Sequence, residues 1–351
     1  MSIRVIQWAT GGVGRAAVAG VVAHPELELV GCWVHSPDKV GRDVGELCRM
    51  EPLGVTATDD IERLVALDAD CVIYSPVMAD PAMVARLLSS GKNVVTPLNW
   101  FFAEGRDETL IETACRAGGS TVHGTGIHPG GITERFPLVV SALSQSITHV
   151  RAEEFSDIRS YGAPGVVGDI MLFGKTPEEA SSSMMPAVLG DGFGQSIALL
   201  GDALGFGLDP RLTVSHEVAV ATAPVDSPIG PIPPGHIAAQ KFCWEATVRG
   251  APVITVRTNW FMGDEHLDPA WTFGPDGERF EVAVTGDPSS EVTFRGWHPA
   301  SIEMGLERNP GIVATATHCV SAVPAVVDAE PGIRSYLDLP PYGGRAALHL
   351  R

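Results

Sequence analysis

The stretch VIQWATGGVGRAAVAGVV, residues 5–22, decides how the rest of the chain is interpreted. It begins with an apolar run typical of a buried strand, passes through a glycine-rich turn and ends in small apolar residues typical of a packed helix. Gly12, Gly14 and Ala17 have the spacing of a dinucleotide-binding loop, in which glycines allow a tight turn and a close approach to pyrophosphate. The alternative is a plain tight turn. We expect a pyrophosphate to bind where the helix begins, on Thr10, Gly11, Gly12, Val13 and Gly14.

Strand patterns alternate with helix patterns through the first 125 residues. Asp80 can cap a helix that Pro81 begins and Gly91 ends, and Asp59 with Glu62 offers a capping box for another helix. This alternation predicts an α/β domain of the Rossmann type, with a doubly wound parallel sheet. The strand patterns occupy residues 3–9, 27–34, 71–75, 93–96 and 120–124.

The pattern changes near residue 130, after which longer segments alternate with a period of two residues. We expect an open, largely antiparallel mixed sheet with helices on one face. Its strands include two around the turn at 249–252, and residues 222–236 read as a surface loop. The helices are expected within 176–189, 193–204 and 309–332. The predicted division is a nucleotide-binding domain (1–130), an α+β substrate and dimerisation domain (131–305) and a C-terminal helix and tail returning to the first domain (306–351).

Composition excludes several classes of protein. The net charge is -18 and the pI is about 4.9, so the surface repels phosphate backbones and a nucleic-acid partner is not expected. By inspection no apolar run is long enough for a membrane helix, and the first residues lack the pattern of a signal peptide. The six cysteines are scattered without a CxxC or Cys/His cluster. We therefore expect reduced thiols, a cytoplasmic location and no metal site.

The end of the second strand bears on the choice of cofactor. NAD sites usually place an acid there to bind the ribose 2′-hydroxyl, whereas this chain has CWVHSPDKVGRD at residues 32–43. His35, Ser36 and Lys39 are donors that suit a 2′-phosphate, so NADP is the expected cofactor and NAD the alternative.

Ligands of a doubly wound sheet bind beyond the carboxyl ends of its strands, where several further candidates lie. The cofactor is expected to contact Ser75, Pro76, Thr96 and Gly126. The segment NVVTPLNWFFAEG, residues 93–105, brings Asn99 and Glu104 to this edge, and either is a candidate to face the reacting carbon. Glu104 needs an apolar setting that shifts its pKa, and otherwise is a solvated loop acid.

Aromatic and histidine candidates complete the expected site. Trp100 and Phe101 are interpreted either as the wall of a substrate pocket or as core residues. His128, within GTGIHPGG at 124–131, can act as a hydrogen-bond donor or acid, or be a structural loop histidine.

With these motifs in place, the chain resembles the dihydrodipicolinate reductase-like superfamily, and within it the diaminopentanoate dehydrogenases and NAD(P)-dependent amine dehydrogenases. The resemblance implies a Rossmann domain, a substrate domain on an open mixed sheet, a returning C-terminal helix, a homodimer, and hydride transfer to an imine or carbonyl carbon. The collinear segments that carry it are QWATGGVGRAAV (7–18), WVHSPDKVGRDVGEL (33–47), GKNVVTP (91–97), GTGIHPGG (124–131), SAVPAVVDAEPGI (321–333) and LDLPPYGGR (337–345).

Two departures from the family pattern keep alternatives open. The His-His pair and lysine of dihydrodipicolinate reductases proper are not found, which makes that activity the weaker alternative. Related amine dehydrogenases place a glutamate just after the fourth strand, where this chain has Asn99, with Glu104 five residues later. The expected function is amine dehydrogenase, acting on small ketones, aldehydes and amines. The alternatives are a carbonyl or imine reductase that does not use ammonia, and a non-catalytic NADP-binding redox sensor.

Overall fold

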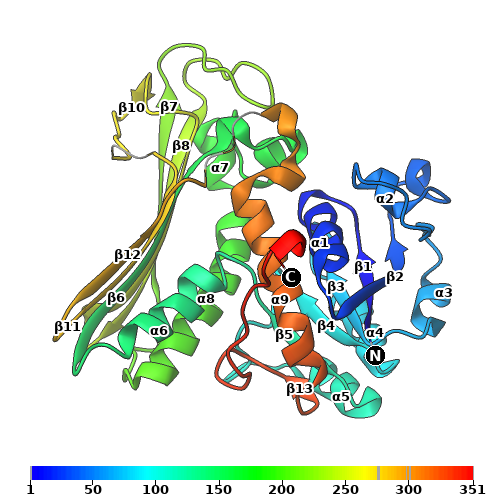
Figure 1. The fold of residues 1–351 in the computed structure, drawn as a ribbon. Coiled ribbons are helices and arrows are strands. Elements are labelled where there is room, and N and C mark those ends of the chain that lie inside the picture. The colour runs from blue at the N-terminus through cyan, green and yellow to red at the C-terminus, as the bar shows by residue number, and fades with distance from the viewer. Residues whose placement is uncertain (1, 275–276, 298, 300–301, 351) are drawn as a thin grey trace. The chain divides into compact units, whose positions relative to one another are not determined.

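The computed structural model describes residues 2–274, 277–297, 299 and 302–350, and it divides into two compact units. The first unit contains residues 1–130 together with 312–351, and the second contains residues 131–311. Figure 1 shows the parallel sheet of the first unit and the long, curved strands of the second. The expected fold class, an α/β protein with a Rossmann-type sheet and a second mixed sheet, is confirmed.

The first unit is built on a six-stranded sheet in the order β13-β5-β4-β3-β1-β2, and every pairing in it is parallel. Its strands are β1 (Ile3–Trp8), β2 (Leu27–Trp33), β3 (Cys71–Tyr74), β4 (Asn93–Thr96), β5 (Thr121–Gly124) and β13 (Gly332–Ile333). Its helices are α1 (Gly12–Ala23), α2 (Val44–Leu47), α3 (Ile61–Ala66), α4 (Pro81–Ser89), α5 (Thr109–Gly118) and most of α9 (Pro310–Val327). The strand order reverses between β1 and β3, which is where such sheets bind ligands.

Local sequence signals explain the helix ends of this unit. The Asp80 carboxylate accepts hydrogen bonds from the backbone N–H groups of Ala82 and Met83, and Pro81 begins α4 as expected. The expected capping box at Asp59 is wrong by one residue, because Asp60 caps α3 by accepting from the Arg63 N–H.

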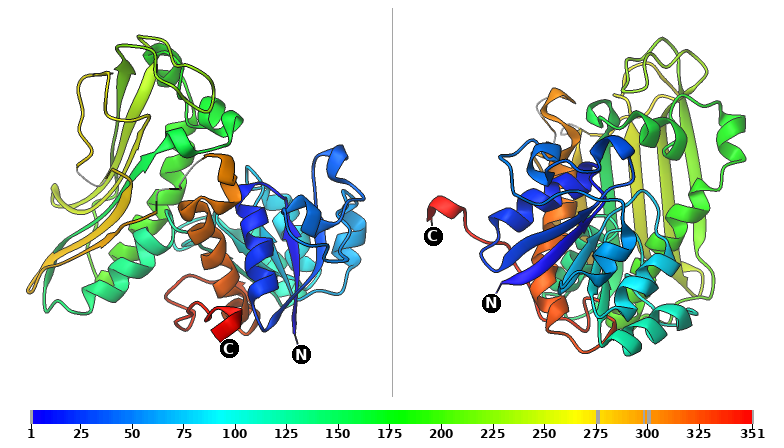
Figure 2. Two further views of the ribbon diagram at one scale, coloured as in Figure 1. Left: turned by 45° about the horizontal axis from the view of Figure 1, so that its top comes forward. Right: turned by 90° about the vertical axis from the view of Figure 1, so that its right-hand side faces the viewer.

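Both faces of the parallel sheet are covered by helices. The face that carries Ile6, Trp8, Val72 and Tyr74 packs in one hydrophobic cluster with residues of α4 and α5. On the other face α9 lies beside α1, where a Cβ at Gly20 would lie 3.1 Å from Val320, and both views of Figure 2 show the two helices together. Among the described helices, α9 alone is long and apolar enough to cross a membrane. Its apolar side packs in this core.

The second unit is built on a seven-stranded mixed sheet in the order β10-β7-β8-β9-β6-β11-β12. Most neighbours are antiparallel, but β6 and β9 run parallel. Its strands are β6 (Ile147–Asp157), β7 (Thr213–Ala221), β8 (Ile237–Val248), β9 (Ala251–Phe261), β10 (Leu267–Asp268), β11 (Arg279–Gly286) and β12 (Ser290–Phe294). Its helices are the π-helix η2 (Gly131–Arg135), α6 (Phe136–Ser141), α7 (Pro177–Ser181) and α8 (Met185–Leu204).

Helices α6 and α8 lie along one face of this sheet, as Figure 1 shows. Phe193 of α8 packs on Trp244 of β8, and Phe136 of α6 packs on Phe294 of β12. Two expectations need correction. The helix expected at 193–204 begins earlier, at Met185, and the expected surface loop 222–236 is anchored by a bridge between Val225 and Ile232, both of which are buried.

Candidate functional site

The glycine loop has the geometry that a bound pyrophosphate requires. Gly11 is the N-cap of α1, no side chain caps the helix, and its first turn carries no acid. A Cβ added at Gly11 would meet no atom within 4 Å, so the approach to its backbone is open. A Cβ at Gly14 would lie 2.1 Å from the Ala9 carbonyl oxygen, so only glycine fits there. These residues therefore fit a dinucleotide cofactor.

A buried glutamine supports this loop and was missed by sequence reasoning. The Gln7 side chain is fully buried, and its Nε2 donates to the Ala9 carbonyl oxygen at 2.9 Å and to Ser75 Oγ at 2.9 Å. Ala9 has a positive φ of 76°, so the loop turns sharply just after the strand. Gln7 thus connects the end of β1 with the end of β3. These are the two strands between which the strand order reverses.

The tip of β2 carries several donors, and the exposed Asp38 lies in the short helix Pro37–Lys39 that follows it. Lys39 Nζ donates to Thr10 Oγ1 at 3.2 Å, which places the lysine beside the glycine loop. Nearby in the sequence, His35 is exposed and Ser36 is half-buried. The carboxylate of Asp43 instead accepts backbone N–H groups of Gly45, Leu53 and Gly54, so it caps α2 and is held away from a ribose.

The loops after β4 and β5 pack against each other within the first unit. Gly124 N–H donates to the Trp100 carbonyl oxygen, and a Cβ at Gly124 would lie 2.2 Å from the Asn99 carbonyl oxygen. Gly126 is in close contact with Pro97, since its Cβ would lie 3.3 Å from the Pro97 Cβ. The structure therefore brings Asn99 and Gly126 to one edge of the sheet.

Several expected contact residues at this edge are buried supports. Thr96 is fully buried and its Oγ1 accepts the Leu98 N–H at 3.3 Å. Trp100 and Phe101 are each 1% exposed, and Trp100 belongs to the hydrophobic core with its Nε1 donating to Glu108 at 2.9 Å. Their burial favours the core interpretation over a pocket wall.

Glu104 does not have the apolar setting that a role in catalysis would need. It is exposed in a turn that ends at Gly105, whose φ is 75°, and the buried neighbours Phe101 and Phe102 do not enclose it. Asn99 is half-buried at the end of β4, and its Oδ1 accepts the Trp100 N–H at 2.8 Å. His128 is half-buried on the loop between Gly126 and Gly130, which approach each other so closely that a Cβ at Gly130 would lie 2.4 Å from the Gly126 carbonyl oxygen.

A polar network near the end of β5 fixes the C-terminal tail. His123 is fully buried, with Nδ1 2.6 Å from the Arg334 carbonyl oxygen and Nε2 3.2 Å from the Tyr342 hydroxyl. Thr125 Oγ1 lies 3.0 Å from His318 Nδ1 of α9 and also bonds to the Tyr336 hydroxyl. This network satisfies both ring nitrogens of the buried His123.

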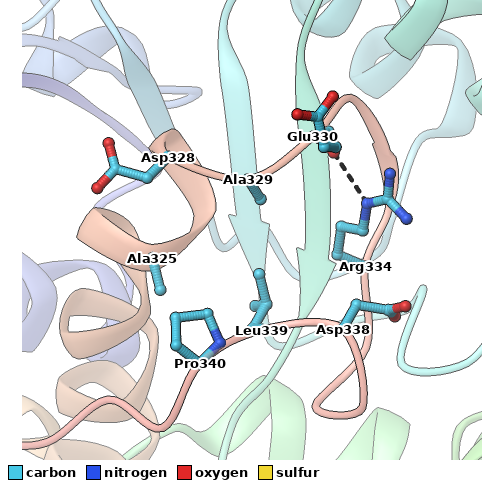
Figure 3. A pocket seen from close by; sticks show the side chains of 8 residues that line it. All are labelled: Ala325, Asp328, Ala329, Glu330, Arg334, Asp338, Leu339 and Pro340. Carbon is cyan, nitrogen blue, oxygen red and sulfur yellow. Dashed lines mark hydrogen bonds between the residues drawn. The ribbon is translucent and has the colours of Figure 1, made fainter.

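A pocket of about 370 Å³ in the first unit lies at the opposite end of the sheet from the glycine loop. It is lined by residues between Ala325 and Pro340, and Figure 3 shows Arg334 donating to the Glu330 carbonyl oxygen there. That same carbonyl oxygen accepts from Thr121 Oγ1 at the first residue of β5, so the pocket lies at the amino ends of the strands. It is therefore not the nucleotide site.

The second unit contains two carboxyl groups with raised pKa values. Burial raises the pKa of Glu134 in η2 to about 8, although Ser196 of α8 donates to its Oε1 at 2.5 Å. Burial also raises the pKa of Glu154 in β6 to about 7, against hydrogen bonds from Ser156 and Trp260 that lower it. Neither acid was predicted from the sequence to belong to the site.

Neither thiols nor metal ligands add to the site. All six cysteines are free, and burial raises the pKa of the Cys32 and Cys319 thiols to about 12, so neither is a ready nucleophile. Across the described ranges of the chain, no group of three or more His, Cys, Asp or Glu side chains is placed to hold a metal.

Comparisons with known proteins give the family. The model of the 2,4-diaminopentanoate dehydrogenase C-terminal domain matches residues 132–344, and that of the dihydrodipicolinate reductase N-terminus matches residues 3–96. An amine dehydrogenase of Streptomyces virginiae is 32% identical over 96% of both chains. The chain belongs to the 2,4-diaminopentanoate dehydrogenase family.

Two further similar proteins have lower sequence identity. The 2,4-diaminopentanoate dehydrogenase of Acetoanaerobium sticklandii is 24% identical over 66% of this chain and 60% of its own length. The solved structure of an amine dehydrogenase from Mycobacterium smegmatis has a TM-score of 0.78 at 20% identity and covers 98% of both chains, which shows a shared fold. The family resemblance expected from the motifs is thereby confirmed, and the chain is an NAD(P)-dependent oxidoreductase.

Proposed function

We propose that the protein is an amine dehydrogenase that prefers NADP and interconverts small primary amines with the corresponding ketones or aldehydes. The observation that carries this proposal is the 32% identity to an amine dehydrogenase over 96% of both chains. The glycine loop at the start of α1 agrees with it, because that loop fits a dinucleotide.

The residues of the first unit would hold the cofactor. The backbone at Gly11 and the start of α1 would bind the pyrophosphate, with Gln7 fixing the shape of the loop. Lys39 and Ser36, with His35, would bind a ribose 2′-phosphate. When bound, the nicotinamide supplies the chemistry of hydride transfer at its C4.

The loops after β4 and β5 would orient the reacting group. Asn99 would direct its amide toward the nitrogen or oxygen of the substrate, with Glu104 as the alternative, and His128 would donate a hydrogen bond or a proton. Trp100 and Phe101 would act indirectly, because their burial fixes the loop that carries Asn99.

NADP preference is the finer part of the proposal, and it rests on Lys39 and on the use of Asp43 as a helix cap. We expect a lower KM for NADPH than for NADH, and Lys39→Ala should raise the KM for NADPH about tenfold while changing that for NADH little, since one charged contact to phosphate is lost. A wild-type enzyme that prefers NADH contradicts the assignment.

We also propose a cytoplasmic homodimer. The six free thiols suit a reducing compartment. The open face of the seven-stranded sheet carries both arginine and glutamate side chains, and a surface with both signs of charge can be complementary to its own copy. Light scattering that gives a monomer mass at micromolar concentration contradicts the dimer.

A carbonyl or imine reductase is the second candidate, because Asn99 stands where related amine dehydrogenases have a glutamate. A silent NADP-binding sensor is the third. NADPH consumption with a panel of ketones and aldehydes, with and without ammonium, separates them. Turnover only with ammonium supports the amine dehydrogenase, turnover without it supports the reductase, and binding without turnover supports the sensor.

The same panel tests the loop after β4. We expect either Asn99→Ala or Glu104→Ala to slow turnover at least tenfold, equivalent to about 1.4 kcal/mol of barrier. If neither does so, the loop does not orient the reacting group. Leu110→Ala, at an exposed position of the neighbouring α5, is the matched control and should leave turnover unchanged.

A further inference from the structure

The loop that follows β5 is attached to its surroundings at its first residue, Thr125. This residue is fully buried, and its N–H donates to the Thr96 carbonyl oxygen of β4 at 2.8 Å. Its own carbonyl oxygen accepts from the Cys319 thiol of α9, with Sγ 3.2 Å away. The backbone of Thr125 is therefore bonded to a strand and to a helix of the first unit. The loop continues through Gly126 and His128, to which the proposed function assigns contacts with the cofactor and the substrate.

The side chain of Thr125 is bonded to α9 and to the C-terminal tail, residues 334–342. Its Oγ1 lies 3.0 Å from His318 Nδ1 and 3.3 Å from the Tyr342 hydroxyl oxygen, and it also bonds to the Tyr336 hydroxyl. The rings of Tyr336 and Tyr342 stack with centroids 6.1 Å apart, so two neighbouring phenol groups reach Thr125. The tail therefore contacts the loop after β5 through a pair of tyrosines.

His123 fixes the direction of the Tyr342 hydroxyl. Its Nδ1 is 2.6 Å from the Arg334 carbonyl oxygen, and because a carbonyl oxygen only accepts, Nδ1 carries the proton. A neutral imidazole has one N–H group, so Nε2 accepts from the Tyr342 hydroxyl, which is 3.2 Å away. Since its proton is directed to His123, the Tyr342 oxygen accepts from Thr125 Oγ1. Tyr342 thus connects a residue of β5 with the first residue of the loop that follows it.

The rest of this loop is closed on itself. Ile127 and Gly130 form an isolated antiparallel bridge. Gly126 and Gly130 lie so close together that a Cβ at Gly130 would be 2.4 Å from the Gly126 carbonyl oxygen. A compact turn whose ends are bonded to each other moves as one body. A displacement of Thr125 would therefore move Gly126 and His128 together.

We propose that Tyr342 is a positioning residue for the loop after β5, and that it acts through Thr125. The tail, in which Tyr342 lies 217 residues after Thr125, would then set where the loop contacts the cofactor and the substrate. This inference rests on the proposed function, because that function places the cofactor and the substrate at this loop. A tail that only adds to stability would have no specific effect on the loop.

Hydrogen–deuterium exchange of the enzyme without cofactor measures the loop directly. Tyr342→Phe removes one hydroxyl and keeps the ring, and Thr125→Val removes its partner at nearly constant volume. We expect either variant to speed exchange of the peptide covering residues 124–131 about fivefold, a factor typical of one lost hydrogen bond. The peptide covering β1, residues 3–8, is the internal reference and should be unchanged. Leu337→Ala, at an exposed position of the same tail, is the control variant and should change neither peptide.

Binding of NADPH, followed by its fluorescence, shows whether the position of the loop matters to the cofactor. We expect Tyr342→Phe and Thr125→Val each to raise the Kd for NADPH about fivefold, and Thr125→Ser, which keeps the hydroxyl, to stay within about twofold of wild type. The double variant Thr125→Val/Tyr342→Phe should bind NADPH about as well as Thr125→Val alone, because the Tyr342 hydroxyl acts through Thr125. Thermal unfolding confirms that each variant is folded.

The proposal is overturned if Tyr342→Phe leaves exchange of the 124–131 peptide unchanged, or if the β1 peptide exchanges faster by the same factor. Faster exchange of the loop with an unchanged Kd for NADPH also overturns it, because the loop would then move without affecting the cofactor. Failure of the proposed function looks different. The wild-type enzyme would then convert no amine, while Tyr342→Phe still loosened the loop and weakened NADPH binding.

Discussion

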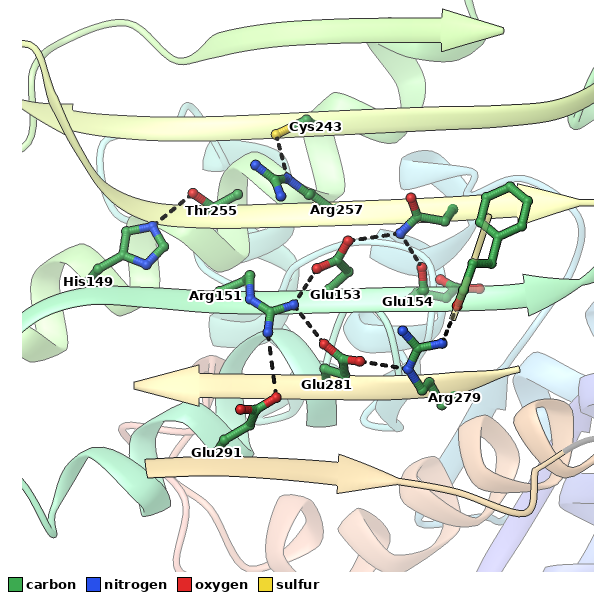
Figure 4. Close-up of polar contacts among 12 residues, drawn as sticks. His149, Arg151, Glu153, Glu154, Cys243, Thr255, Arg257, Arg279, Glu281 and Glu291 are labelled. Carbon is green, nitrogen blue, oxygen red and sulfur yellow. Dashed lines mark hydrogen bonds and ion pairs between the residues drawn. The ribbon is translucent and has the colours of Figure 1, made fainter. Parts of the chain in front are cut away.

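Glu153 and Glu154 are neighbours in β6, but their side chains lie on opposite faces of the sheet. The hydrogen-bond and ion-pair partners of the two carboxyl groups differ. On the open face, Glu153 shares Arg151 with Glu281, and Arg279 donates to Glu281 at 2.6 Å (Figure 4). On the helix-covered face, Glu154 is bonded by a hydroxyl and an indole among aromatic rings. The first face holds its carboxylates in ion pairs with arginines, whereas the second holds Glu154 by neutral donors. The predictions that follow test this contrast.

Removing Arg151 should have the largest effect on stability. Its side chain is 24% exposed and bridges Glu153, 10% exposed, and Glu281, 14% exposed. Arg151→Met leaves a nearly buried carboxylate without its cation, so we expect a loss of roughly 3 kcal/mol in the free energy of unfolding. Urea denaturation measures it. The double variant Arg151→Met/Glu153→Gln should recover at least about 1 kcal/mol, and no recovery would show that Arg151 acts through packing alone.

Glu134 of η2 is fully buried, and it should make the free energy of unfolding fall as pH rises. Its pKa is raised from 4.5 to about 8, so below pH 4.5 it is protonated in both folded and unfolded chains. Between these values the unfolded chain releases the proton that the folded chain keeps, and the loss grows until the folded pKa is passed.

Glu134→Gln should therefore be more stable than wild type at high pH by at least about 2 kcal/mol, and the increase in pKa, at about 1.4 kcal/mol per unit, sets the upper limit of the difference. The two proteins should converge at low pH. Thermal unfolding at pH 5, 7 and 9 checks this, with the exposed Glu104→Gln as a control that leaves the pH dependence unchanged. If the stability of wild type and of Glu134→Gln depended on pH in the same way, Glu134 would already be ionised in the folded protein.

The smallest effect is expected at Arg257, which shares the open face with Arg151. Its side chain is 43% exposed, its nearest carboxylate in Glu245 is 3.9 Å away, and its Nε donates to Cys243 Sγ at 3.4 Å. Arg257→Met should change the free energy of unfolding by less than about 1 kcal/mol, because exposed pairs contribute little. If Arg257→Met lowers the free energy of unfolding as much as Arg151→Met does, exposure does not determine which arginines of this face contribute to stability.

The features that the sequence predicted correctly depend on residues that are close together in the chain. The glycine loop was identified because its requirements are met within a few consecutive residues, from Thr10 to Ala17, and the strands of the parallel sheet because each is a short apolar run. The cap of α3 was misplaced by one residue because Asp59 and Asp60 are equally suited to cap a helix, and only backbone geometry distinguishes them.

The environment of Glu154 could not be predicted in this way. Its partners Trp260 and Phe280 lie more than one hundred residues further along the chain, and they reach it through a strand register that the alternation of side chains does not determine. Glu104 shows the opposite case. Aromatic neighbours in sequence indicated an apolar setting, but the turn at Gly105 leaves the acid exposed while those neighbours turn into the core.

The pairing of β13 with β5 has a consequence for synthesis on the ribosome. Residues 332–333 complete a sheet whose other strands end at residue 124, and α9 covers a face of that sheet from the same late part of the chain. The whole second unit is therefore translated before β13 can pair with β5 and before α9 can cover its face of the parallel sheet. The last step in the folding of that sheet thus follows the synthesis of residues 332–333.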